Sequence, residues 1–94
     1  MSTSRPLGRR FSIRGRVQGV GFRDFVQREA RQRNIKGNVR NAADGSVVVS
    51  AVGFPAEMKE FEGLLRVGPR WSEVRGFDVE EIPATPFDDF RIVH

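Results

Sequence analysis

The chain of 94 residues is long enough for one small domain with one hydrophobic core, and too short for two. Its 38% of hydrophobic residues can fill that core, and a sequence without cysteine excludes disulfides, thiol catalysis and thiolate metal sites. Residues 1–40 carry eleven Lys and Arg against two acids, whereas residues 41–94 carry five against ten, so the amino-terminal half is strongly basic.

The first predicted elements are a short tail, a strand and a helix. We expect residues 1–8 to form a flexible tail and residues 9–94 to form one domain. Apolar and polar residues alternate over residues 9–17, which predicts a strand with one buried face. Over residues 22–33 the apolar residues recur every three or four positions, which predicts a helix, and Asn34 can close it in a left-handed conformation.

The rest of the chain alternates between short apolar runs and turn residues. It predicts, in chain order, a strand, a strand, a helix, a strand and a short closing strand, at residues 36–41, 46–52, 55–67, 71–82 and 90–94. The resulting order, βαββαβ plus a terminal strand, is typical of the α+β ferredoxin-like fold. This fold is a split βαβ sandwich in which two helices cover one face of an antiparallel sheet.

This topology places the ends of two strands at one edge of the sheet. The first βαβ crossover makes the first two strands parallel, with the third strand antiparallel between them. The chain that leaves the first strand leads to Arg23, and Asn41 ends the second strand. Alternation puts Asn41 on the same face as Val39, which we assign to the helix side. We therefore expect Arg23 and Asn41 to meet, although a turn-starting role alone would also explain an asparagine here.

The segment between the first strand and the first helix is rich in glycine, with Gly15, Gly19 and Gly21. Glycine lets the backbone adopt positive φ and approach a ligand, so the amide hydrogens of residues 18–22 can converge on one anion. The segment enters a helix amino terminus, where unpaired N–H groups favour phosphate or carboxylate. Arg23, in the first turn, has a guanidinium that suits phosphate. The alternative is an ordinary strand-to-helix turn with a surface arginine.

Two nucleotide-binding motifs are missing from this segment. The sequence contains no Lys-Ser or Lys-Thr pair for a nucleotide-hydrolase phosphate loop, and Asp24 stands where the dinucleotide fingerprint needs a glycine. Backbone amides, an arginine and a carboxamide can bind a phosphoryl group and orient a water, but they supply no nucleophile or strong base. Such a site suits a small-molecule acyl phosphate. Its leaving group is a carboxylate, so its hydrolysis needs no cofactor, metal, general acid or covalent step.

The same residues carry a resemblance to a known family. Residues 15–23 and 37–41 resemble the signature stretches of the acylphosphatase family, and the similarity extends over residues 8–94. The resemblance implies a metal-independent hydrolase in which Arg23 binds the phosphate and Asn41 positions the attacking water. In the family the amides of the loop complete the cradle, and here that loop consists of Gln18, Gly19, Val20, Gly21 and Phe22.

An RNA-binding module is the main alternative, because the same fold hosts such modules and the amino-terminal half is basic. These modules stack bases on aromatic residues of the sheet. The strand at residues 46–52 has no aromatic residue, and Phe11 lies on the predicted core face, so we expect no nucleic-acid partner. A non-catalytic module that binds RNA or another anion stays the second interpretation.

Asn38 departs from the resembled family, which often has a tryptophan at this position.

The remaining expectations concern the protein's surroundings. No apolar run approaches the ~20 residues of a membrane span, and residues 1–10 lack the hydrophobic region of a signal peptide. We expect a cytoplasmic monomer without membrane contact. Of the isolated titratable residues, we interpret His94 as a solvated terminus, Asp24 as helix-start electrostatics and Asp44 as turn chemistry.

Overall fold

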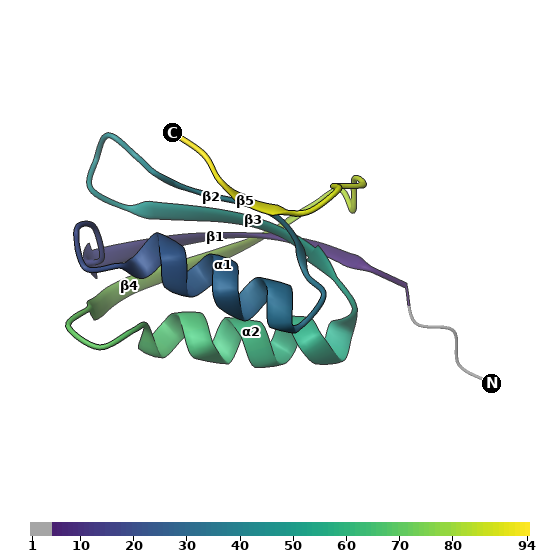
Figure 1. Ribbon diagram of the computed structural model, residues 1–94, viewed down its shortest axis with the longest axis horizontal. Helices are drawn as coiled ribbons and strands as arrows, with labels where there is room; N and C mark the ends of the chain where they lie inside the picture. The colour runs from purple at the N-terminus through teal and green to yellow at the C-terminus, as the bar shows by residue number, and fades with distance from the viewer. Residues whose placement is uncertain (1–4) are drawn as a thin grey trace.

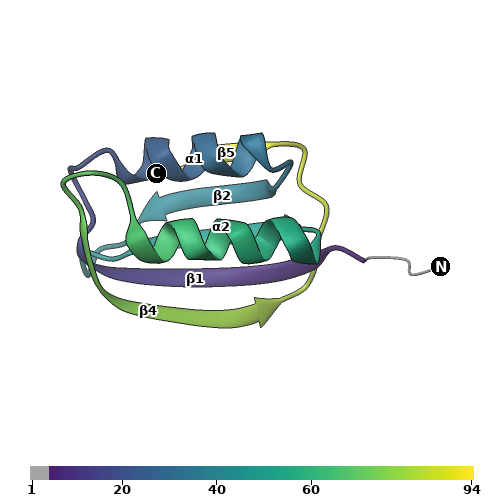
Figure 2. The ribbon, with the colours of Figure 1, turned by 90° about the horizontal axis from the view of Figure 1, so that it is seen from below.

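The computed structural model describes residues 5–94, which form five strands and two helices. The elements are β1 (Leu7–Arg16), α1 (Phe22–Gln32), β2 (Lys36–Asn41), β3 (Val47–Gly53), α2 (Pro55–Val67), β4 (Glu73–Ile82) and β5 (Phe90–Ile92). The strands make one sheet in the order β4-β1-β3-β2-β5, and both helices cover the same face of it (Figure 1; Figure 2). The predicted α+β ferredoxin-like fold is confirmed. Neither helix of the described residues is long and apolar enough to cross a membrane.

One strand departs from the predicted antiparallel sheet. β5 lies parallel to β2, with Val39 opposite Ile92, so the sheet is mixed. The reason is the connection: β4 ends at the side of the molecule where β2 begins (Figure 2), so the chain that crosses there to the far edge enters β5 in the direction of β2. That direction carries the residues after β5 toward the end of β2.

Strand boundaries also differ from the prediction by one or two residues, and the starts of β1 and β4 have a clear structural reason. β1 begins at Leu7, inside the predicted tail of residues 1–8, because the first residues of the strand continue its register with β3. Residues 1–4 of that tail lie outside the described residues. β4 begins at Glu73 rather than at Trp71, because Trp71 has φ 76, a left-handed conformation that does not continue a strand.

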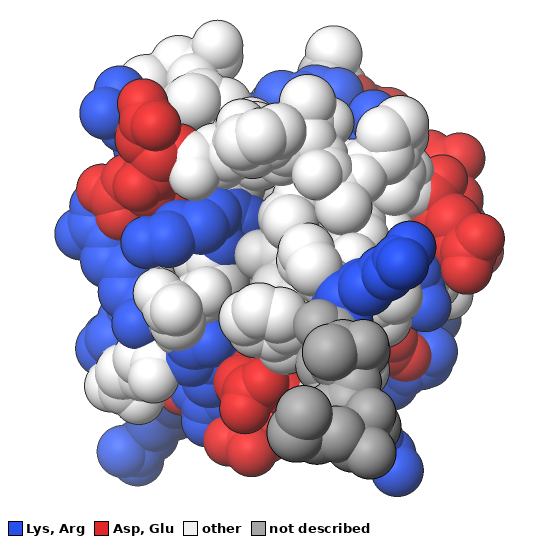
Figure 3. Space-filling view, turned by 90° about the vertical axis from the view of Figure 1, so that its right-hand side faces the viewer, with Lys and Arg blue, Asp and Glu red and all other residues white. Residues whose placement is uncertain are grey.

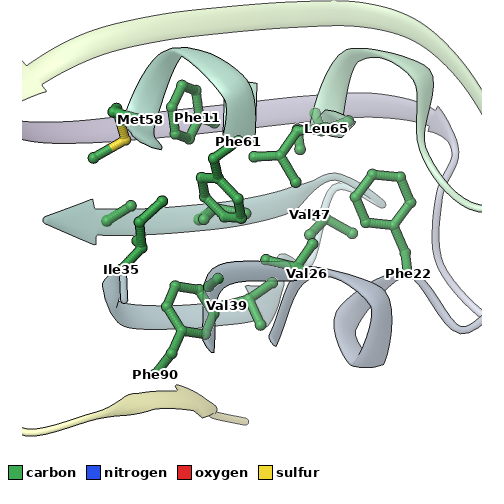
Figure 4. Close-up of a cluster of buried hydrophobic side chains, with 14 of the residues drawn as sticks. Phe11, Phe22, Val26, Ile35, Val39, Val47, Met58, Phe61, Leu65 and Phe90 are labelled. Atoms are coloured by element: carbon green, nitrogen blue, oxygen red, sulfur yellow. The ribbon is translucent and has the colours of Figure 1, made fainter. Parts of the chain in front are cut away.

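The hydrophobic core lies between the helices and the sheet, and phenylalanines dominate it (Figure 4). The rings of Phe11 and Phe90 each pack edge to face against Phe61, with centroids 6.2 Å apart. Phe22, the first residue of α1, is 1% exposed and lies at one end of the cluster. Burying one such side chain stabilises a fold by roughly 1.5–3 kcal/mol. The core therefore fixes the point at which the glycine-rich segment enters α1.

The basic first strand lies beside an acidic neighbour. Arg10 and Arg14 of β1 form ion pairs with Glu80 and Asp78 of β4, at 3.0 and 2.5 Å. At the end of the molecule shown in Figure 3, Lys and Arg side chains likewise lie next to Asp and Glu side chains. The imbalance of charge along the sequence is thus partly cancelled in space.

Candidate active site

A pocket of about 440 Å³ opens between the start of α1, the end of β2 and the chain that follows β5. Its lining consists of Val17, Gly19, Gly21, Phe22, Arg23, Asp24, Asn41, Ile92 and His94. The structure thus brings Arg23 and Asn41 to one cavity, as the topology predicted. Gly19 and Gly21 of the predicted loop also reach it, whereas Gln18 and Val20 do not line it.

The glycines of the loop leave its backbone open to the pocket. Gly19 and Gly21 have φ 74 and 77, and a Cβ added to either would meet no atom within 4 Å. Gly21 is also the N-cap of α1, which has no side-chain cap. The first helical hydrogen bond runs from the Phe25 N–H to the Gly21 carbonyl, at 3.1 Å. The N–H groups of residues 22–24 precede it, so they have no partner in the helical ladder and can bind an anion.

The start of the loop is held by a close backbone contact. β1 and β4 change register between Arg14 and Gly15, which is a β-bulge. Gly15 has φ 127, and a Cβ there would lie 2.1 Å from the Glu73 carbonyl oxygen. Only glycine fits this position without moving β4, and the bulge directs the chain out of the sheet and into the loop.

The side chain of Gln18 makes contacts that were not predicted, whereas the prediction for this residue concerned its backbone amide. Its Nε2 donates to the carbonyl oxygens of Ala42 and Ser46, at 3.0 and 2.9 Å. These carbonyls belong to the turn that follows Asn41. The Gln18 side chain therefore ties the loop beside Arg23 to the strand end that carries Asn41, rather than facing the pocket.

The turn after β2 is itself closed by a carboxylate. The backbone N–H and the hydroxyl of Ser46 donate to Asp44 Oδ1, at 3.0 and 2.6 Å. The side-chain hydrogen bond from Ser46, followed by its backbone hydrogen bond, lowers the pKa of Asp44 below its ordinary value of 3.8. This agrees with the predicted turn role of Asp44.

Asn41 brings an unsatisfied acceptor to the pocket. It is the last residue of β2 and lies opposite Val47 of β3. Its Oδ1 is buried and has no hydrogen-bond partner among residues 5–94. A buried polar group without a partner costs roughly 1–3 kcal/mol, so the described chain leaves a hydrogen-bonding group unused at a residue that lines the pocket.

Arg23 has one side-chain hydrogen-bonding neighbour in the described part of the chain, which is His94. Arg23 Nη1 lies 3.4 Å from His94 Nδ1, and no carboxylate of residues 5–94 forms an ion pair with Arg23. His94 is exposed, as a solvated terminus would be, but the parallel direction of β5 also carries it to the pocket, which was not predicted. Only the direction of that short strand could have revealed His94. Asp24 also lines the pocket, at the start of α1.

The donors of the pocket define what it can do. None of its residues carries a hydroxyl or a thiol. Within residues 5–94, no three His, Asp or Glu side chains gather as metal ligands. What converges is a helix amino terminus, a guanidinium without a carboxylate partner and a buried carboxamide oxygen. Fold and site together define a ferredoxin-like protein whose pocket is suited to a phosphoryl group or a similar anion.

Comparison with known proteins narrows this class to one family. The acylphosphatase family profile matches residues 9–92. An acylphosphatase of Solibacter usitatus is 54% identical over 84 residues, covering 89% of this chain and 88% of the relative. The crystal structure of acylphosphatase from Bacillus subtilis matches with a TM-score of 0.90 at 38% identity, covering 94% of this chain and 99% of that one. The chain belongs to the acylphosphatase family, and its reaction is the hydrolysis of acyl phosphates.

The same fold is also found within a longer protein. Full-length HypF, in a phosphate- and nucleotide-bound form, matches with a TM-score of 0.91 at 30% identity. The match covers 99% of this chain and 12% of that one. The fold of this chain therefore corresponds to one part of HypF.

Proposed function

We propose that this chain hydrolyses small-molecule acyl phosphates with a water that Asn41 orients, while Arg23 and the loop amides hold the phosphoryl group. The observation that carries this proposal is the buried Asn41 Oδ1 without a partner, in the same pocket as Arg23 and the uncapped start of α1. Gly19, Gly21 and Phe22 of the predicted loop line the pocket and contribute their backbone to it. The ring of Phe22 is buried in the core, and the side chain of Gln18 is bonded to the turn after β2.

The reaction follows from these positions. Asn41 Oδ1 accepts one hydrogen of the water, which points an oxygen lone pair at phosphorus. The new oxygen–phosphorus bond forms as the bond from phosphorus to the acyl oxygen breaks, and the bonding pair leaves on the carboxylate. A phosphoryl oxygen of the substrate takes the proton of the water, so the products are a carboxylate and inorganic phosphate. Arg23 and the amides stabilise the negative charge on the phosphoryl oxygens.

The leaving group explains why so few residues suffice. A carboxylate is a stable anion and departs without a proton donor, whereas the alkoxide of a phosphate ester needs a general acid, a metal or a covalent step. The pocket supplies positioning and positive charge, and hydrolysis by this site requires no metal. Acyl phosphates are therefore substrates, and simple phosphate monoesters are not.

We also propose that the protein acts as a monomer in the cytoplasm and without a nucleic-acid partner. Two features of the first strand argue against an RNA-binding module. The aromatic ring of Phe11 is fully buried, and the arginines Arg10 and Arg14 of the same strand are paired with carboxylates of β4. Size-exclusion chromatography with light scattering tests the monomeric state, and RNA binding measured at rising salt tests the absence of a nucleic-acid partner.

The role of Asn41 is tested by Asn41→Ala, with Asn38→Ala as the matched control. Asn38 lies on the same strand but does not line the pocket. Loss of one oriented contact in the transition state costs about 10²-fold in kcat, and KM should change little because the water is not part of the bound substrate. Asn38→Ala should keep both constants. An unchanged kcat in Asn41→Ala would refute the role of Asn41.

A further inference from the structure

His94 reaches the pocket by a defined path. Ile92 and His94 line the pocket, while the residue between them, Val93, donates its N–H to the Val39 carbonyl oxygen at 2.9 Å. The chain after β5 thus continues along β2 as an extended strand would. The position of His94 is set by a backbone hydrogen bond one residue before it, and not by a contact of the imidazole alone.

The contact with Arg23 restricts the hydrogen-bonding role of the His94 ring nitrogen. A guanidinium has five N–H donors and no acceptor, so the 3.4 Å contact from Arg23 Nη1 requires His94 Nδ1 to be the acceptor. A protonated imidazole at the same place would repel the guanidinium, unless an anion lay between the two cations.

We propose that His94 is a second anion-binding residue of the pocket, acting with Arg23 in a pH-dependent way. When neutral, it orients the guanidinium of the empty pocket. When protonated, it binds the phosphoryl oxygens together with Arg23, so anion binding and proton uptake favour each other. This inference rests on the proposed phosphate-binding role of Arg23.

The charged groups around His94 are few. From α1, Arg23 and Asp24 line the same pocket. From β2, Asn41 faces it and carries no charge, and the loop contributes the glycines Gly19 and Gly21. Imidazole is the side chain whose charge ordinarily changes between pH 5 and 8. Asp24 is the carboxyl side chain among the residues that line the pocket, so the test must separate its titration from that of His94.

Inorganic sulfate is the probe, because it keeps two negative charges from about pH 5.5 to pH 8. Its inhibition constant against benzoyl phosphate is measured over this range for the wild-type chain and for His94→Gln, His94→Lys and Asp24→Asn. In the wild type we expect sulfate to bind roughly five-fold more tightly at pH 5.5 than at pH 8. This is the change in affinity that corresponds to the attraction of one pair of unit charges about 4 Å apart in water. His94→Gln should bind sulfate weakly at every pH, and His94→Lys tightly at every pH.

Two outcomes would overturn the inference. One is a His94→Gln variant with the pH dependence of the wild type. The other is a pH dependence that Asp24→Asn removes and His94→Gln retains. Sulfate binding is also measured for Arg23→Gln, to separate a failure of the His94 inference from a failure of the proposed function. Weaker sulfate binding in Arg23→Gln supports the phosphate-binding role of Arg23, independently of the result for His94. Circular dichroism of each variant confirms folding before the comparison.

Discussion

The tie between the loop and the turn after β2 gives the sharpest mutational prediction. Gln18→Leu shortens the side chain by one atom and removes its donations to the carbonyls of Ala42 and Ser46. Both carbonyls keep a backbone donor, since Gly45 N–H donates to Ala42 O and Ala42 N–H to Ser46 O. The loss is thus two hydrogen bonds without orphaned acceptors, worth roughly 1–2 kcal/mol in the free energy of unfolding.

The same change should lower kcat more than that loss of stability explains. Without the tie, the loop that carries Arg23 and the strand end that carries Asn41 are no longer held at a fixed separation. A misplacement of about 1 Å can cost up to 10²-fold in rate, so we expect kcat to fall at least about ten-fold at a temperature where the variant is folded.

The assay compares Gln18→Leu with Gln27→Leu, by urea unfolding and by steady-state kinetics. Gln27 also donates from Nε2 to a backbone carbonyl, that of Phe90, at 3.0 Å, but it has no contact with the turn. Both variants should lose stability, and only Gln18→Leu should lose kcat. If the two variants had the same kcat, the tie would have no part in positioning the site.

The remaining predictions concern stability. Gly15→Ala should destabilise the fold by at least roughly 2 kcal/mol, because its Cβ would meet the Glu73 carbonyl at 2.1 Å and its φ of 127 is strained for alanine. Gly63→Ala, in α2 with no atom within 4 Å of the new Cβ, should instead stabilise it by roughly 0.5–1 kcal/mol, and chemical unfolding of both variants checks the contrast. Asp44 has a lowered pKa in the folded state, so its stabilising hydrogen bonds from Ser46 are complete above pH 3.8 and are lost as the pH falls through the lower folded value. As the pH is lowered, the free energy of unfolding should therefore decrease less in Asp44→Asn than in the wild type. Equal decreases would contradict the stabilising role of the Asp44 carboxylate.

The sequence was sufficient for the features that local patterns encode. Strand alternation and helical spacing predicted the elements, because each reflects one buried face against one core. The topology then brought Arg23 and Asn41 to one pocket although the two lie on different elements. The glycines of the loop were visible because positive φ at Gly19 and Gly21 needs a particular residue type.

The features that were missed depend on contacts between distant segments. A strand of three residues such as β5 has too few positions to show its direction, so the parallel pairing and the placement of His94 could not be read from it. The Gln18 side chain joins a turn far along the chain, and no local pattern indicates such a bond. The left-handed conformation of Trp71, which delays β4, likewise has no signal in a bulky residue type.

The most direct test of the account is the hydrolysis of benzoyl phosphate with EDTA present, with a phosphate monoester as the second substrate. The wild type, Arg23→Gln and Arg28→Gln are compared, since Arg28 is an arginine of the same helix that does not line the pocket. We predict turnover of the acyl phosphate alone, a fall of about 10²-fold or more in Arg23→Gln, and a normal rate in Arg28→Gln. A normal rate in Arg23→Gln, or loss of the wild-type rate in EDTA, would contradict a phosphoryl group held by Arg23 in a metal-free pocket.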